Sequence, residues 1–371
     1  MPNDLMPPPF NALLDVPVFP ADRFAPLADT VARILQTRND VLLVQAEAVV
    51  ALEAVAASLA RPGLKALNIV TSPYGTWFGQ WLRRGGAEVR QLAAEPGLPI
   101  TAAEVEAALQ ADTDIQVLAL VHAESASGIA NPLEEIVALA RSRGIVTVVD
   151  AVASVGGHPL DVDGLGIDVA VIGPQKSLGG PAGVSALSVS AKAWELILRD
   201  GALTNSILSL VDLKRLWIDT GRKALPGTPA PLEFWALKAA LDRVEAEGID
   251  AVVARHQRAA RATRDGLQAL GLTLWVDAAQ ASNLVTVARL PEGVVVGDLF
   301  RVAAAFEMDM SPGVGAGAER LVRFNHTGQR ARFDVVLANV VAYGQALHAL
   351  GAQVDIAEAA VAVSKHFSPA P

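Results

Sequence analysis

The stretch Ile145–Lys176 reads IVTVVDAVASVGGHPLDVDGLGIDVAVIGPQK. It contains two short β-branched runs, IVTVVD ending at Asp150 and DVAVI beginning at Asp168, with a glycine-rich segment between them. Apolar runs without polar alternation are typical of strands that are buried on both faces of a parallel sheet. Because Asp150 ends the first run and Lys176 follows the second, we expect both side chains at the same edge of one sheet, where the sites of α/β proteins lie.

Similar runs occur on both sides of this stretch. VLLVQ begins at Val41, KALNIVTS at Lys65, IQVLALV at Ile115 and VSALSVS at Val184. Helical patterns separate them, at residues 47–60, 101–111 and 131–144. Strands that alternate with helices predict an α/β fold with a mostly parallel sheet covered by helices on both faces.

The C-terminal third has a different pattern. After a loop at residues 221–234 we expect helices at 235–247 and 249–270, the strands LTLWV, NLVTVA and RLVRF, and a last helix at 330–350. The alanine-rich tail gives no clear pattern. We therefore predict a proline-rich N-terminal arm (1–24), a large domain (25–235) and a smaller C-terminal α+β domain (236–371).

Composition restricts the class of protein. The 371 residues are 52% hydrophobic and 19% charged, and the net charge of −9 includes no basic block. We therefore expect neither a nucleic acid nor a membrane as partner. The absence of cysteine excludes disulfides, thiolate metal sites and cysteine nucleophiles, and the scattered histidines give no metal-binding pattern, so we expect no metal. Residues 1–18 lack the pattern of a signal peptide, and we expect a cytoplasmic protein.

Nucleotide-binding motifs do not fit the sequence. In GPQKS, Gln175 stands where a P-loop needs glycine, and no G-x-G-x-x-G follows a strand. A carboxylate and a lysine at adjacent strand ends instead suit pyridoxal chemistry, in which the lysine forms a Schiff base and the aspartate keeps the pyridine nitrogen protonated. An ordinary buried Asp150–Lys176 ion pair is the alternative, and the two residues alone do not decide between them.

The region from Val149 to Glu195 resembles the cofactor region of class V, fold-type I aminotransferases, in particular the alanine–glyoxylate aminotransferase group. VHAESASGIANPL (121–133) and RFNHTG (323–328) resemble two further segments of that family. The resemblance covers about Val41 to Arg332. It implies a large domain with a mostly parallel seven-stranded sheet and a pyridoxal phosphate-type active site.

Carried onto this chain, the resemblance implies a role for individual residues. Lys176 is the Schiff-base lysine, and Asp150 is the partner of the pyridine nitrogen. Val152 packs under the ring, Tyr74 stacks above it, Ser125 lies near the ring hydroxyl, and Gln175 contacts a ring substituent or the phosphate end. Arg323 binds the substrate carboxylate. Thr228 completes the active site of a neighbouring subunit, which implies a homodimer or a dimer of dimers.

One departure concerns the phosphate-binding turn. In the usual members a Ser/Gly-rich turn opens a helix whose backbone amides bind the phosphate. Here Glu47, Ala48 and Val49 occupy that turn, and Glu47 would repel a phosphate. The same glutamate resembles the pyridoxamine–pyruvate transaminases, a branch of the family that uses free pyridoxamine as amino donor. That branch has a second substrate arginine at the position of Val314.

We therefore expect a transaminase that moves an amino group from pyridoxamine to a 2-oxo acid, giving pyridoxal and an L-amino acid such as alanine. Pyridoxal and pyridoxamine would then be bound substrates. The first alternative is a conventional pyridoxal-phosphate-dependent aminotransferase of the alanine–glyoxylate kind. The second is a vitamer-binding or scaffold protein that has lost catalysis, against which Lys176, Asp150 and Arg323 argue together.

Overall fold

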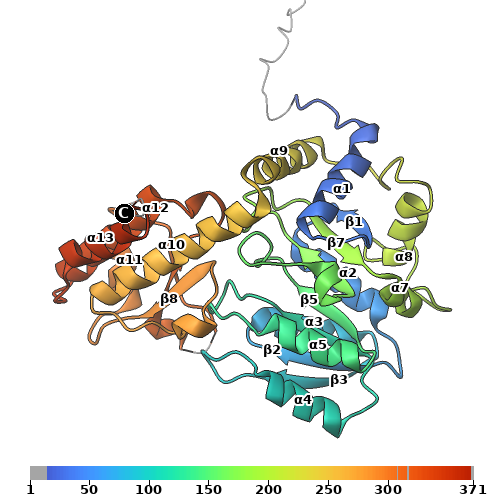
Figure 1. Cartoon of the computed structure of the whole chain (residues 1–371), viewed down its shortest axis with the longest axis horizontal. Coiled ribbons are helices and arrows are strands. Elements are labelled where there is room, and N and C mark those ends of the chain that lie inside the picture. The colour runs from blue at the N-terminus through green and yellow to red at the C-terminus, as the bar shows by residue number, and fades with distance from the viewer. Residues whose placement is uncertain (1–14, 307, 316, 369–371) are drawn as a thin grey trace, which may run out of the picture.

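The computed structural model describes residues 15–306, 308–315 and 317–368, and it contains two sheets of unequal size. The larger sheet is built from the N-terminal two thirds of the chain, and the smaller belongs to the C-terminal third (Figure 1). Residues 1–14 of the expected arm lie outside the described residues. The boundary expected at residue 235 stays a prediction, and helix α9 (Pro231–Glu247) spans it.

The larger sheet has seven strands in the order β1-β7-β6-β5-β4-β2-β3. Its members pair in parallel except β7, which is antiparallel to both of its neighbours. The strands are β1 (Asp40–Val44), β2 (Lys65–Val70), β3 (Glu88–Ala93), β4 (Val117–Val121), β5 (Val146–Asp150), β6 (Val169–Ile172) and β7 (Ser185–Val189). The mostly parallel seven-stranded sheet expected from the sequence is therefore confirmed.

Helices cover both faces of this sheet. Successive residues of each strand point to opposite faces, and they therefore belong to two separate hydrophobic cores. Leu43 and Val149 belong to one core, with α1 (Phe24–Ile34), α4 (Ala102–Ala111) and α5 (Leu133–Ser142). Leu42 and Val148 belong to the other, with α2 (Ala48–Leu59), α3 (Pro73–Arg84) and α7 (Ala191–Ile197). Strands that are buried on both faces are apolar throughout, which explains the uninterrupted runs in the sequence.

The register of the central strands determines where the candidate site forms. Asp150 at the end of β5 lies opposite Val121 at the end of β4 and Val171 near the end of β6. The segments that follow these three strands therefore leave the sheet side by side, at its carboxyl edge.

The C-terminal third packs three helices on a small antiparallel sheet of order β8-β10-β9. Helix α10 (Ile249–Ala269) runs from α9, beside the large sheet, to this second unit (Figure 1). The remaining elements are β8 (Val285–Arg289), α11 (Val296–Ala303), β9 (Met310–Pro312), β10 (Leu321–Asn325), α12 (Phe333–Ala349) and α13 (Ile356–Lys365). Helices α10, α12 and α13 pack together around a third core, in agreement with the expected α+β unit.

The prediction of a strand at residues 272–276 was wrong. LTLWV (272–276) forms only an isolated bridge between Leu274 and Ala288, beside two backbone hydrogen bonds to β8. A segment that makes so few bonds at a sheet edge is not a full strand. The tail without a clear pattern forms α13. Within the described residues, no helix is long and apolar enough to cross a bilayer.

Candidate active site

A cavity of about 240 Å³ lies at the carboxyl edge of β4 and β5, beside the segment that follows β6. Eight residues expected from the sequence line it: Glu47, Ala48, Val49, Tyr74, Ser125, Asp150, Val152 and Lys176. They come from five separate parts of the chain, so the fold is what brings them together. The volume is below the range of drug-sized ligand sites and suits one substituted aromatic ring.

Lys176 lies in a tight turn after β6. Gly179 donates its N–H to the Lys176 carbonyl at 3.1 Å, and Gly180 donates to the Pro174 carbonyl at 2.7 Å. The lysine Nζ donates to Ser125 Oγ at 3.4 Å. Burial lowers the pKa of Lys176, and the Glu47 carboxylate opposes that change. A larger neutral fraction makes this amine a better base and nucleophile than an exposed lysine.

Asp150 faces the same cavity from the end of β5. Its Oδ1 accepts the Val152 N–H at 3.0 Å. Burial raises the pKa of Asp150 to about 6, and the charge of Lys176 opposes that increase. Among the ion pairs of the described residues there is none between Asp150 and Lys176, so the alternative of a structural ion pair gains no support. The carboxyl group therefore remains free to meet a ring nitrogen.

Glu47 caps the N-terminus of α2 with its own carboxylate. Its Oε2 accepts the Val49 N–H at 2.8 Å, and its Oε1 accepts a hydrogen bond from the Gln175 amide at 2.6 Å. The helix N-terminus attracts an anion. That anion is supplied here by the protein itself.

Tyr74 and Arg323 approach Ser125 from two different elements. Tyr74 lies in the first turn of α3, where the Ser72 hydroxyl accepts the Tyr74 N–H. Burial raises the Tyr74 pKa, and a hydrogen bond with Ser125 opposes this. Arg323 on β10 donates through Nη1 to the Ser125 carbonyl at 2.9 Å and through Nε to the Pro312 carbonyl at 3.0 Å. The guanidinium is thereby held beside the cavity, and these two bonds use only part of its five N–H donors.

Three expected residues are absent from the cavity lining: Gln175 and Arg323, which bond to the lining residues Glu47 and Ser125, and Thr228. Thr228 is exposed, in a loop where Gln45 contacts the Pro226 carbonyl and the Ala230 N–H. Val314, the position of the second arginine in the related branch, is 39% exposed. Neither residue contributes to the cavity of the single chain.

The sequence analysis missed six residues of the cavity wall, of which two carry polar or aromatic groups: Leu52, Trp77, Val121, Ala123, Glu124 and Ala153. Trp77, one turn after Tyr74 on α3, packs edge-on against that tyrosine. Glu124 is fully buried, and its Oε1 accepts a hydrogen bond from Thr71 at 2.6 Å. No local feature of the sequence indicated this burial, because Glu124 follows the end of β4 by three residues and Thr71 reaches it from a distant part of the chain.

The C-terminal unit contacts the lysine turn through Gly328. His256 on α10 accepts the Gly328 N–H at 2.8 Å, and Arg255 donates to the Gly328 carbonyl at 2.6 Å. Gly328 has φ of +59°, and a Cβ there would lie 2.9 Å from the Lys176 carbonyl oxygen. Only glycine permits this approach without strain.

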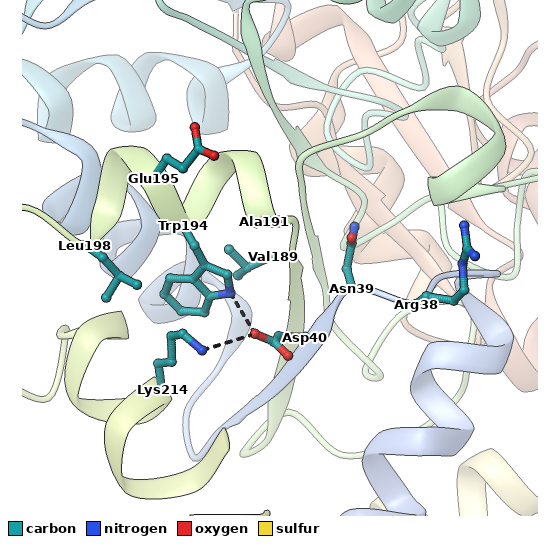
Figure 2. A pocket seen from close by; sticks show the side chains of 9 residues that line it. All are labelled: Arg38, Asn39, Asp40, Val189, Ala191, Trp194, Glu195, Leu198 and Lys214. Atoms are coloured by element: carbon teal, nitrogen blue, oxygen red, sulfur yellow. Dashed lines mark hydrogen bonds and ion pairs between the residues drawn. The ribbon is translucent and has the colours of Figure 1, made fainter. Parts of the chain in front are cut away.

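A second, open depression of about 640 Å³ lies where β1 begins and β7 ends, away from the carboxyl edge (Figure 2). Its lysine, Lys214, lies 3.6 Å from Asp40 and 2.9 Å from Asp219, and Trp194 donates to Asp40 at 2.9 Å. These groups satisfy one another, and none of the residues expected at the site lines this depression. In the part of the chain that the structure describes, no cluster of three or more histidine or acidic side chains could hold a metal ion.

The family model and the three relatives described here are all aminotransferases or transaminases. The family model for aminotransferase class V matches residues 22–295. A pyridoxamine–pyruvate transaminase from Mesorhizobium japonicum is 34% identical over 343 residues, which cover 91% of this chain and 87% of that protein. The crystal structure of pyridoxamine–pyruvate aminotransferase from Mesorhizobium loti superposes with a TM-score of 0.89 at 31% identity, covering 94% of this chain and 89% of that one. An alanine–glyoxylate aminotransferase from Mus musculus is 29% identical, covering 82% of this chain and 74% of that protein.

Proposed function

This chain belongs to the class-V aminotransferase family, and we propose that within it the protein moves an amino group from unphosphorylated pyridoxamine to a 2-oxo acid, giving pyridoxal and an L-amino acid such as alanine. The family membership makes it an aminotransferase. The choice of vitamer rests on one observation, which is that the Glu47 carboxylate occupies the N-terminus of α2.

A phosphate group would need that helix terminus. Glu47 Oε2 already accepts the Val49 N–H, and Gln175 fixes the other carboxylate oxygen. Of the described residues that line the cavity, only Lys176 carries a positive charge, and pyridoxal chemistry requires that lysine for another purpose. A neutral hydroxymethyl group, in contrast, can donate a hydrogen bond to Glu47. The residues present therefore suit the pyridine ring of vitamin B6 and disfavour its phosphate ester.

Lys176 and Asp150 would hold the ring along its axis. Asp150 would stabilise the protonated ring nitrogen, and the bound ring supplies the electron sink of the reaction. Lys176, whose pKa burial lowers, would take a proton from one of the two carbons next to the transferred nitrogen and return it to the other. Val152 and Tyr74 would enclose the two faces of the ring, and both line the cavity.

Arg323 would bind the carboxylate of the 2-oxo acid. It is fixed through two backbone carbonyls and still has guanidinium N–H groups available for a second, charge-assisted pair of bonds. Val314 offers no second guanidinium at the position where the related branch has one. Arg323 is therefore the one guanidinium that this proposal assigns to the carboxylate of the 2-oxo acid.

A homodimer is part of this proposal. Ile207 is 89% exposed and Leu216 is 54% exposed, and both line an apolar depression of about 730 Å³ next to the loop that carries Thr228. Exposed apolar side chains gathered in this way are typical of an association surface. A second copy on this face would bring its Thr228 loop close to the depression. The cytoplasmic location expected from the composition is also part of the proposal.

The deciding experiment compares two ligands. The purified protein, freed of bound ligand, is titrated separately with pyridoxal and with pyridoxal phosphate, and the visible absorbance of the bound ligand is followed. We expect tighter binding of pyridoxal, together with amino transfer from pyridoxamine to pyruvate. Tighter binding of the phosphate ester, with transfer from alanine to glyoxylate, would establish the conventional alternative. The similarity of this chain to an alanine–glyoxylate aminotransferase is the observation that favours the alternative.

A further inference from the structure

The buried carboxyl group of Glu124 has no assigned role in the reaction described above. Its side chain is fully buried and lines the cavity beside Asp150. One oxygen, Oε1, accepts a hydrogen bond from the Thr71 hydroxyl at 2.6 Å. The other oxygen, Oε2, is buried without a hydrogen-bond partner among the described residues. A buried polar atom in this state is costly, which points to a partner that arrives with the ligand.

The hydrogen-bond network around Glu124 determines which oxygen can carry a proton. The Asn131 side-chain oxygen accepts the Ile100 N–H at 3.2 Å, so the Asn131 amide nitrogen must be the atom that points to Thr71, at 3.0 Å. The Thr71 oxygen therefore accepts from Asn131 and gives its own hydrogen to Glu124 Oε1. Oε1 is thus an acceptor, and Oε2, which has no hydrogen-bond partner among the described residues, is the oxygen on which a proton of Glu124 would lie.

The order of the strands determines which edge of a bound ring Glu124 faces. Glu47 begins α2, which packs over β6 and β7, on one side of β5. Glu124 follows β4, on the other side of β5. In pyridoxamine the 5-hydroxymethyl and the 3-hydroxyl groups lie on opposite sides of the line from the ring nitrogen to the 4-substituent. With the nitrogen at Asp150, the 4-substituent at Lys176 and the hydroxymethyl group at Glu47, the 3-hydroxyl edge faces Ser125 and Glu124.

We propose that Glu124 is a protonated carboxylic acid in the working enzyme and donates a hydrogen bond from Oε2 to the 3-oxygen of the bound vitamer. This inference rests on the proposed function for the orientation of the ring. It gives the buried oxygen a partner and gives the phenolate-like ring oxygen a neutral donor. Burial, as the larger cause, and the charge of Asp150 raise the pKa of Glu124 to about 7, although the hydroxyl groups of Ser72 and Thr71 oppose the change. A neutral carboxylic acid can act as a strong donor to a developing or fixed negative charge in this way.

The test measures binding of pyridoxamine, which does not condense with Lys176, and of an analogue with hydrogen in place of the 3-hydroxyl. Calorimetric titration of the wild type should give roughly tenfold to a hundredfold tighter binding of pyridoxamine, the range for a hydrogen bond to a charged group. Glu124→Ala should lose most of that preference. Glu124→Gln should keep it, because the amide oxygen can accept from Thr71 while the amide N–H donates from the position of Oε2.

The pH dependence of the same preference separates an acid from a merely structural side chain. In the wild type the preference should decline as the pH rises through about 7, because Glu124 then loses its proton. Glu124→Gln should show no such decline. The other ionisable groups on or beside the cavity are unchanged in this variant: Glu47, Tyr74, Asp150, Lys176 and Arg323. The comparison therefore isolates Glu124 even if the alanine variant does not fold.

The outcomes are distinct. An unchanged preference in Glu124→Ala, an equal loss for both ligands, or identical pH profiles for the wild type and the glutamine variant would overturn the assignment. Failure to bind pyridoxamine at all would overturn both this inference and the proposed function. If the wild type instead binds pyridoxal phosphate more tightly than pyridoxal, the proposed function fails, and the comparison of the two pyridoxamines still decides the role of Glu124.

Discussion

Replacing Glu47 with serine should convert the candidate active site from one that prefers pyridoxal to one that prefers pyridoxal phosphate. Serine is a good helix N-cap, so α2 keeps a capping side chain and the fold should be retained. The Val49 N–H, which Glu47 Oε2 now occupies at 2.8 Å, would become available to an external anion. The change therefore removes a negative charge and opens an anion site in one step.

The expected magnitude follows from the geometry. A phosphate oxygen that bonded to the same amide would lie within about 4 Å of the Glu47 carboxylate, and two unit charges at that distance repel by about 4 kcal/mol at an effective dielectric of 20. Glu47 is only partly buried, so solvent reduces this value. Even half of it, about 2 kcal/mol, corresponds to a change of more than tenfold in relative affinity. We expect the ratio of the two dissociation constants to shift by about a hundredfold toward the phosphate ester.

The assay uses the two ligand titrations with Glu47→Ser, Glu47→Gln and a control, Glu53→Ser. Glu53 lies on the same helix and pairs with Arg84, so its replacement removes an equal charge from α2 outside the cavity. The control should retain the wild-type ratio. Glu47→Gln should shift the ratio in the same direction as serine, since it removes the charge at nearly constant size. If both Glu47 variants retain the wild-type ratio, the electrostatic argument is wrong.

Three further predictions concern the other groups of the site. Lys176→Ala should abolish amino transfer while leaving the melting temperature unchanged or slightly higher, because a buried amine with a lowered pKa is removed; turnover near the wild-type level would refute its role. Arg323→Ala should raise the KM for the 2-oxo acid at least tenfold and the KM for pyridoxamine much less. Val314→Arg should lower the KM for pyruvate. Steady-state kinetics measures both effects. The folded-state pKa of Asp150 is raised from 3.8 to about 6, so its contribution favours folding below pH 4 and is lost as the pH rises through 6. The difference corresponds to at most roughly 3 kcal/mol, and chemical denaturation of the ligand-free protein at pH 4 and pH 7 should show that Asp150→Asn reduces this dependence.

The large sheet could be predicted because most of its strands are buried on both faces. Strand β3 (Glu88–Ala93) was the exception, since it lies at the sheet edge and its sequence EVRQLA is largely polar and exposed. In the C-terminal unit, β9 (Met310–Pro312) is too short to leave a pattern. Helix α13 was missed because alanine-rich sequence is compatible with helix and with irregular chain alike.

The resemblance to the family named the residues of the candidate site that lie at strand ends and at the start of a helix, and this part of the site could be predicted. Lys176 and Asp150 follow from their position after buried strands, and Glu47 from its place before a helix. Glu124 could not be assigned, because its burial depends on Thr71, which is distant in sequence and reaches it only through the pairing of β2 with β4. Contacts of this kind are a property of the tertiary structure and leave no local pattern.

The close approach of Gly328 to the Lys176 carbonyl has a consequence for the geometry of the site. It brings the turn that follows β10, the strand of Arg323, against the turn that carries Lys176, and the atoms that meet belong to the main chain. The spacing between these two turns therefore does not depend on which side chains fill the cores on either side. A larger residue at position 328 would push the two turns apart, and with them Lys176 and Arg323, even if both cores kept their packing.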